Sequence, residues 1–146
     1  RGLGDVYKRQ ALTDWTTNSD DLIKYYSGTA VYKSSFKLDA APDGNHILID
    51  LGDFVAMARV KVNGQDAGGL WTAPYTLDIT DLVKAGDNEV EIEVVNTWLN
   101  RLIGDLNLPE AKRTTWAAIN SWKADSPLQK AGLFGPVVIE SVDYAE

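Results

Sequence analysis

The sequence contains no cysteine, and this absence excludes disulfide bonds and thiolate metal sites. No apolar run approaches the ~20 residues that a membrane-spanning helix needs. The single histidine, His46, follows a predicted turn and is expected at the surface, which argues against a histidine-based triad or zinc site. A net charge of −7 argues against nucleic acid or an anionic membrane as partner, because both need a basic face. Neutral ligands such as sugars fit this charge.

The first ten residues differ in charge from the rest of the chain. Arg1, Lys8 and Arg9 outnumber Asp5, so residues 1–10 carry +2 and the other 136 carry −9. The run DVYKRQ resembles a translated adaptor from a sequencing library, and the alternative is an ordinary terminus. Both interpretations leave residues 1–10 out of the fold. The adaptor interpretation also predicts that the chain is the end of a longer protein.

Alternation of apolar and polar residues dominates the remaining sequence. A period of two residues predicts half-buried strands, and it recurs in the segments 29–39, 46–51, 55–62, 85–95 and 135–142. Asn63-Gly64 predicts a tight hairpin, since both turn residues need a positive φ. Helical signals are short, at 20–26, 81–85 and 114–122. The pattern predicts an all-β sandwich with one or two short helical turns, and 104–133 is expected to wrap it or to form a functional loop.

A resemblance to a known domain follows from residues 60–96. The stretch contains V-N-G, then D-I-T-x-L-x-x-G-x-N, then an alternating strand. It resembles the sugar-binding jelly-roll domain of glycoside hydrolases related to family 2. The resemblance implies a galactose-binding-like jelly-roll β-sandwich, in which Asp78 and Thr80 cap a helical turn at 81–84.

Three further runs narrow this resemblance, namely SGTAVYKSSF, NTWLNRLIGD and AGLFGPVVIE. They resemble the C-terminal β-sandwich of glycoside hydrolase family 106, whose members are α-L-rhamnosidases with the catalytic domain N-terminal to this one. The resemblance implies a bacterial, periplasmic or secreted enzyme of plant or microbial polysaccharide breakdown. It also gives the expected organisation, which is an adaptor-like leader at 1–10, a lead-in segment at 11–28 and the β-sandwich at 29–146.

The acidic residues have structural explanations, so we assign no catalytic residue. Glycoside hydrolysis commonly uses two carboxyl groups that flank the scissile bond. Asp20 and Asp21 lie at a predicted helix start, and Glu89, Glu91 and Glu93 line the solvent face of a strand. The resemblance implies that a structural calcium is possible, since related jelly rolls often carry one in acidic loops, but the sequence has no D-x-D-x-D-G spacing to which one could be assigned. We therefore expect a non-catalytic domain and assign it no metal or other cofactor.

Polar residues interrupt the alternation in NTWLNRLIGD. Arg101 can bind Asp105 and pin a chain crossing, which is the structural interpretation. In the functional interpretation, Asn100, Arg101 or Asp105 faces the missing catalytic domain or contacts sugar hydroxyls. Both remain open at the level of sequence.

The tryptophans suggest a sugar platform, because flat aromatic rings stack on pyranoses. Trp98 falls in a strand pattern and is expected in the core, and Trp15 is expected to tether the lead-in segment. The loop aromatics are candidates for substrate binding or for interdomain contacts: Trp71, Tyr75, Trp116 and Trp122.

Three hypotheses about function follow. The first is an accessory domain that docks on the missing catalytic domain of an α-L-rhamnosidase-like enzyme. The second is a free-standing carbohydrate-binding module, and the third is a structural interdomain sandwich. A binding module needs an exposed loop aromatic in a polar site, whereas a docking domain exposes an apolar patch. The expected partner is therefore carbohydrate or the catalytic domain.

Overall fold

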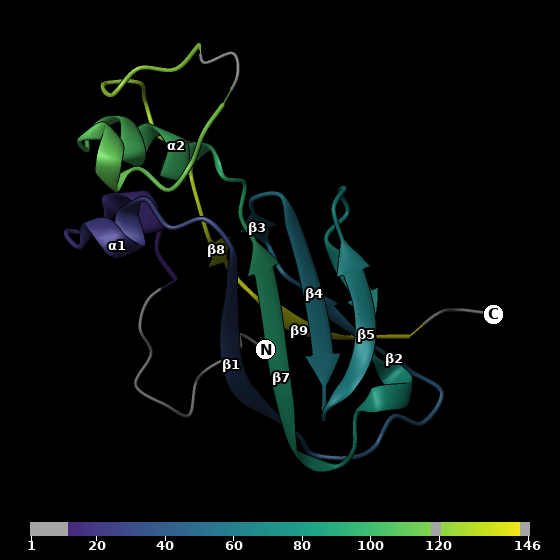
Figure 1. Cartoon of the computed structure of the whole chain (residues 1–146). Helices are drawn as coiled ribbons and strands as arrows, with labels where there is room; N and C mark the ends of the chain where they lie inside the picture. The colour runs from purple at the N-terminus through teal and green to yellow at the C-terminus, as the bar shows by residue number, and fades with distance from the viewer. Residues whose placement is uncertain (1–11, 118–120, 144–146) are drawn as a thin grey trace.

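The computed structural model describes residues 12–117 and 121–143, and it is built mainly of antiparallel strands (Figure 1). The larger sheet has four strands in the order β1 (Thr29–Leu38), β7 (Gly86–Val95), β4 (Met57–Val62) and β5 (Gln65–Leu70). The second sheet has three strands in the order β6 (Thr76–Asp78), β2 (His46–Asp50) and β9 (Val138–Val142). A short pair joins β3 (Asp53–Phe54) to β8 (Leu133–Gly135).

The core lies between these sheets, and it confirms the predicted sandwich. Alternate residues of β7 and β4 are buried because successive side chains on a strand point to opposite faces. They join the inward residues of β2 and β9 in one apolar cluster, which includes Ala58, Val60, Val62, Val90, Ile92, Val94, Ile47, Ile49 and Ile139.

The predicted hairpin is present between β4 and β5. Asn63 and Gly64 have φ values of 51° and 79°, as a tight turn between twisted strands requires. A register shift at Val60 and Lys61 then places Arg59 opposite Gly69. That shift decides which outward side chains meet on this sheet.

The D-I-T segment forms a helical turn one residue earlier than predicted, as the 3₁₀ helix η2 (Thr80–Leu82). The prediction that Asp78 and Thr80 cap this turn is wrong, because Thr80 lies inside it and the N-cap is Ile79, which makes no side-chain cap bond. Asp78 Oδ1 accepts a hydrogen bond from Thr80 N at 2.9 Å. The Thr80 hydroxyl accepts from Ile47 N at 2.9 Å, so it ties the turn to β2.

Helical structure gathers at one end of the sandwich, where α1 (Asp21–Lys24) and α2 (Leu99–Leu106) lie close together (Figure 1). The remaining 3₁₀ turns are η1 (Trp15–Thr17) and η3 (Glu110–Lys112). The prediction of α1 is confirmed, whereas α2 was not predicted. The helical prediction for 114–122 is wrong for the described residues 114–117 and 121–122, which are irregular.

The prediction that Trp98 lies in the core is also wrong. β7 ends at Val95, and Trp98 becomes the residue before α2, with 55% of its surface exposed. Trp15 does tether its segment, since its Nε1 donates to the Tyr32 hydroxyl at 2.8 Å and its N donates to Ala131 O at 3.0 Å.

The adaptor-like leader at 1–10 lies outside the described residues, and the expected division into 1–10, 11–28 and 29–146 stays a prediction. β1 begins at Thr29. Within the described ranges, no helix is long and apolar enough to cross a membrane.

Candidate functional site

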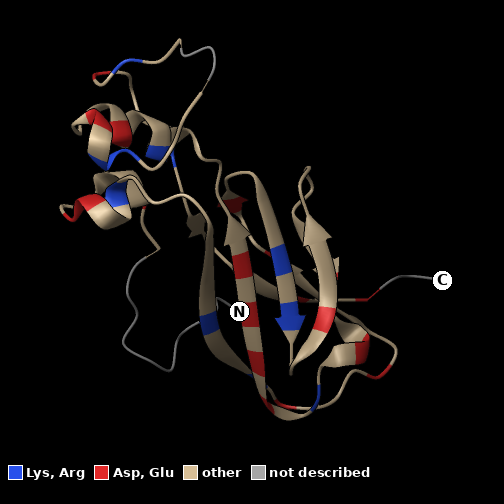
Figure 2. Cartoon of the chain, in the orientation of Figure 1, with Lys and Arg blue, Asp and Glu red and all other residues tan. Residues whose placement is uncertain are grey.

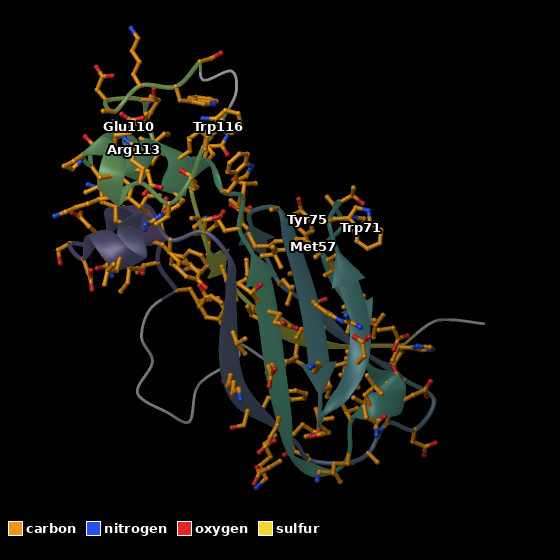
Figure 3. All side chains as sticks on the ribbon, viewed as in Figure 1. Met57, Trp71, Tyr75, Glu110, Arg113 and Trp116 are labelled. Atoms are coloured by element: carbon orange, nitrogen blue, oxygen red, sulfur yellow. The ribbon has the colours of Figure 1, made fainter. Side chains whose placement is uncertain are left out.

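One end of the four-stranded sheet carries loops with exposed aromatic side chains. Met57 at the start of β4 pairs with Val95 at the end of β7, and β5 also ends beside the start of β4. The chain therefore leaves β5 and β7 at the same end of the sheet. Figure 3 shows Met57, Trp71 and Tyr75 together at this end, with Trp116 on the connection after α2.

The two candidate aromatics of the β5–β6 loop have different environments. Trp71 is 68% exposed, and the edge of its ring would lie 3.6 Å from a Cβ atom added to Gly69. Tyr75 is half-buried against the core, and its ring centroid lies 4.5 Å from that of Phe54. Trp71 is thus accessible to a ligand or a partner, while Tyr75 belongs to the wall of the sandwich.

The other aromatic candidates lie in a layer that we call the α2 cap. It consists of Trp98, α2 and the described residues 107–117 and 121–131, and it extends beyond the end of the sandwich (Figure 1). Trp116 is 80% exposed, and Trp122 is 41% exposed. Together with Trp98, they give the cap an exposed aromatic surface.

The side chain of Asn100 binds the backbone at the end of this cap that precedes β8. Its side chain is 1% exposed. Nδ2 donates to Gln129 O at 2.6 Å, and Oδ1 accepts from Gln129 N at 2.8 Å. The amide therefore satisfies a backbone donor and a backbone acceptor in a buried place, where leaving either unpaired is costly.

Asp105 holds the part of the cap that carries Trp116. Its Oδ2 accepts from the backbone N atoms of Thr114 and Thr115, both at 2.7 Å, and from their hydroxyls at 3.0 and 2.9 Å. Burial alone would raise the pKa of Asp105, but these hydrogen bonds outweigh burial and hold the pKa below its usual range. Asp105 therefore stays ionised and fixes the backbone before Trp116.

Arg101 completes this arrangement. Its Nε donates to Thr114 Oγ1 at 3.1 Å and lies 3.1 Å from Asp105 Oδ1. Oδ1 is buried and accepts no hydrogen bond from the described residues. These contacts correspond to the pinning interpretation of Arg101 and Asp105. Contact of Asn100, Arg101 or Asp105 with sugar or with a catalytic domain stays a prediction.

The outer face of the four-stranded sheet carries balanced charge. Figure 2 shows the acidic residues of β7 between basic residues on β1 and β4. Lys33 Nζ lies 3.6 Å from Glu91 Oε2. Arg59 binds Asp66 through Nε, at 3.2 Å, and through Nη2. This hydrogen-bonded ion pair lowers the pKa of Asp66 and raises that of Arg59.

His46 lies at the surface, as predicted, where its Nδ1 is 2.6 Å from Asp78 Oδ2. Hydrogen bonds from the Thr80 hydroxyl and amide, and then from His46, lower the pKa of Asp78 to about 2. Across the described ranges, no group of three His, Cys, Asp or Glu side chains is arranged to hold a metal ion.

Sequence reasoning missed Arg59, Asp66 and Gly69 on the outer face of β4 and β5, where Arg59 pairs with Gly69 and binds Asp66. The Asn63-Gly64 hairpin was a usable signal, because a two-residue turn fixes which residues of its strands face each other. The register shift between Val60 and Lys61 changes that pairing, however, and the alternation of apolar residues gives no sign of it.

The family comparison identifies the type of domain. Residues 4–128 match the family described as glycosyl hydrolase 2 galactose-binding domain-like. This match, together with the antiparallel architecture, confirms the predicted galactose-binding-like fold class.

Three relatives span the range of similarity. A Formosa agariphila protein provisionally named a beta-glucuronidase is 36% identical over 88% of this chain and 13% of its own length. The structure of a rhamnosidase from Novosphingobium sp. PP1Y is 43% identical, with a TM-score of 0.80, over 88% of this chain and 12% of that chain. A Dictyoglomus thermophilum beta-D-glucuronidase is 24% identical, with a TM-score of 0.51, over 66% of this chain and 18% of that chain, which shows the fold alone. The chain thus spans about an eighth of the length of the first two relatives.

Proposed function

Because this chain belongs to the family of galactose-binding-like domains of glycosyl hydrolase 2, we propose that it is the accessory domain of a bacterial α-L-rhamnosidase-like enzyme. In this proposal it is the C-terminal domain and supports the catalytic domain without supplying a catalytic residue. The parent enzyme acts in plant or microbial polysaccharide breakdown, in the periplasm or outside the cell.

The relatives support the rhamnosidase class over the glucuronidase class. The Novosphingobium rhamnosidase structure matches with 43% identity and a TM-score of 0.80, whereas the Dictyoglomus glucuronidase structure matches with 24% and 0.51. The Formosa protein carries a glucuronidase name at 36% identity. Hydrolysis of α-L-rhamnosides is therefore the substrate class to test first.

The observation that carries the docking role is the exposed aromatic surface of the α2 cap. Trp98 and Trp116 are 55% and 80% exposed, and a fully buried tryptophan covers about 150–250 Å². Burying such side chains against the catalytic domain would remove several hundred Å² of apolar surface from water. The bonds of Asn100, Arg101 and Asp105 hold the cap in shape, so we assign these three residues to positioning it.

Carbohydrate is the second proposed partner, and the exposed Trp71 favours it. With 68% of its surface exposed, Trp71 leaves its ring accessible for stacking on a pyranose. Trp116 and Trp122 are further candidates on the cap, while Tyr75 supports the loop from its half-buried position.

A chimera tests the docking role. The matching segment of the Novosphingobium rhamnosidase is replaced by this chain, and hydrolysis of an aryl α-L-rhamnoside is measured beside that of an enzyme lacking the segment. We expect the chimera to be active and the deletion variant to lose activity or thermal stability. This chain alone should hydrolyse neither aryl rhamnoside nor aryl glucuronide. A folded but inactive chimera, or activity of the isolated chain, would contradict the proposal.

A further inference from the structure

The Trp71 indole lies close to Gly69 on the outer face of the four-stranded sheet. A Cβ atom added to Gly69 would lie 3.6 Å from Cζ3 and 3.9 Å from Cε3 of the Trp71 indole. Gly69 pairs with Arg59, whose neighbours Ala58 and Val60 are buried, so this side of Gly69 faces outward. The edge of the indole therefore lies close to Gly69 on this outer side of β5, while 68% of Trp71 remains exposed to solvent.

A hydrogen-bonded ion pair lies on the same outer face of β4 and β5, and it begins at Arg59, the residue opposite Gly69. Arg59, directly opposite Gly69, binds Asp66 through Nε and Nη2. Asp66 Oδ1 also accepts from Gly68 N at 3.1 Å, which ties the carboxylate to β5 itself. A guanidinium has five N–H donors, and two of them bond to Asp66. Arg59 therefore keeps donors, and Asp66 keeps acceptor sites, for a ligand.

This combination matches the two surfaces of a pyranose. The C–H face of the ring stacks on an indole, and the hydroxyls at its edge each need a donor and an acceptor. An arginine–carboxylate pair presents both at a set spacing, and its fixed geometry reduces the entropy lost on binding. Met57, exposed at the start of β4, lies near Trp71 and offers an adaptable apolar contact (Figure 3).

We propose that Trp71, Arg59 and Asp66 form a binding subsite for a neutral pyranose on the outer face of β4 and β5. The sugar is neutral because the polar pair carries no net charge, and the chain as a whole carries −7 and repels anionic saccharides. The subsite rests on the second proposed partner, carbohydrate at Trp71, and is independent of the docking role of the α2 cap, so each can fail without the other.

The test is an NMR titration of the 146-residue chain, labelled with ¹⁵N, with L-rhamnose, D-galactose, D-glucose and D-xylose. At least one sugar should shift the Trp71 indole N–H, the Gly69 amide and Arg59 Nε–H saturably, with a dissociation constant on the order of 1 mM. D-Glucuronate should bind more weakly than that sugar. Absence of a saturable shift with all four sugars, shifts confined to Trp116 or Trp122, or tighter binding of glucuronate would each overturn the proposal.

Three substitutions separately test the contact of the indole with Gly69, the indole itself and the guanidinium of Arg59. Trp71→Ala should abolish the shifts at Gly69 and Arg59, and Gly69→Val should weaken binding about tenfold by displacing the ring while keeping it. Arg59→Lys keeps the positive charge but removes the planar guanidinium with its paired N–H donors, so it should also weaken binding. The control Val31→Ala removes an exposed apolar side chain from β1 of the same sheet and should leave affinity unchanged. Binding that survives Trp71→Ala or Gly69→Val at wild-type affinity would refute the subsite.

Discussion

Asn100 pairs with Gln129 as a strand residue would, through Nδ2 to the carbonyl at 2.6 Å and through Oδ1 to the amide at 2.8 Å. The two residues are 29 positions apart, and the pair closes the long connection between α2 and β8. Closing a loop of this length costs conformational entropy, so the connection needs fixed points. Asn100 and Asp105 provide two of them within the α2 cap.

Replacing Asn100 with alanine should destabilise the protein. The substitution leaves the amide and the carbonyl of Gln129 without their partner in a buried place, and we expect a loss of about 2 kcal/mol or more in the free energy of unfolding. Urea denaturation measures it. Asn45→Ala, which removes an exposed amide bonded to Ser141 Oγ, is the control and should cost less than about 1 kcal/mol. Equal losses in the two variants would argue against a holding role for Asn100.

Asp105→Asn should loosen the backbone before Trp116. An asparagine at this place turns an NH₂ group or a single carbonyl oxygen toward the four donors of Thr114 and Thr115. We expect a loss of about 3 kcal/mol, because the change breaks a buried, charge-assisted network. Hydrogen exchange at the amides of Thr114 and Thr115 should accelerate along with the lower stability. In Asp125→Asn, which changes an exposed carboxylate of the same connection, both amides should keep their wild-type protection.

The free energy of unfolding should decrease in acid, because protonation of Asp78 removes the bonds that stabilise its ionised carboxylate. Its pKa is about 2 in the folded chain, against an ordinary value of 3.8, so the folded form favours the ionised carboxylate. The stabilisation is complete above about pH 4 and disappears as the pH falls through about 2, because only the unfolded chain takes up the proton in that interval. The free energy of unfolding, measured from pH 6 to pH 2, should decline less steeply in Asp78→Asn. An unchanged slope in that variant would show that the Thr80 and His46 bonds do not stabilise the ionised form.

Gly104→Ala should destabilise the contact between α1 and α2. In a helix interior, replacing glycine with alanine normally stabilises the helix by about 1 kcal/mol. At Gly104, however, a Cβ atom would lie 2.5 Å from Cγ of Tyr25. We therefore expect a net loss of about 1–3 kcal/mol in thermal or urea unfolding. Gly69→Ala adds a Cβ at an ordinary 3.6 Å contact and should change stability little. A stabilised Gly104→Ala variant would contradict the packing of Tyr25 on α2.

The strands were predictable because their local and tertiary requirements agree. Alternation fixed the inward faces of β4 and β7, and Asn63-Gly64 fixed the turn after β4, since both residues adopt the positive φ that they tolerate. No long-range information was needed for either feature.

The α2 cap was harder to predict, because polar residues form much of its interior. Asn100 and Asp105 are buried by bonds to residues that come later in the chain, and no periodicity shows such bonds. The alternation of β7 also hid the change to helix after Val95, so Trp98 was expected in the core. The pairing of Arg59 with Gly69 depends on a register shift that only the folded sheet contains.

Hydroxyl-radical oxidation of the tryptophans tests the docking role most directly. It is measured in the free chain and in the rhamnosidase chimera. The account predicts that Trp98 and Trp116 are oxidised in the free chain and protected in the chimera, while Trp71, on the outer face of the sheet, reacts in both. Equal oxidation of Trp98 and Trp116 in the two proteins would contradict docking through the α2 cap.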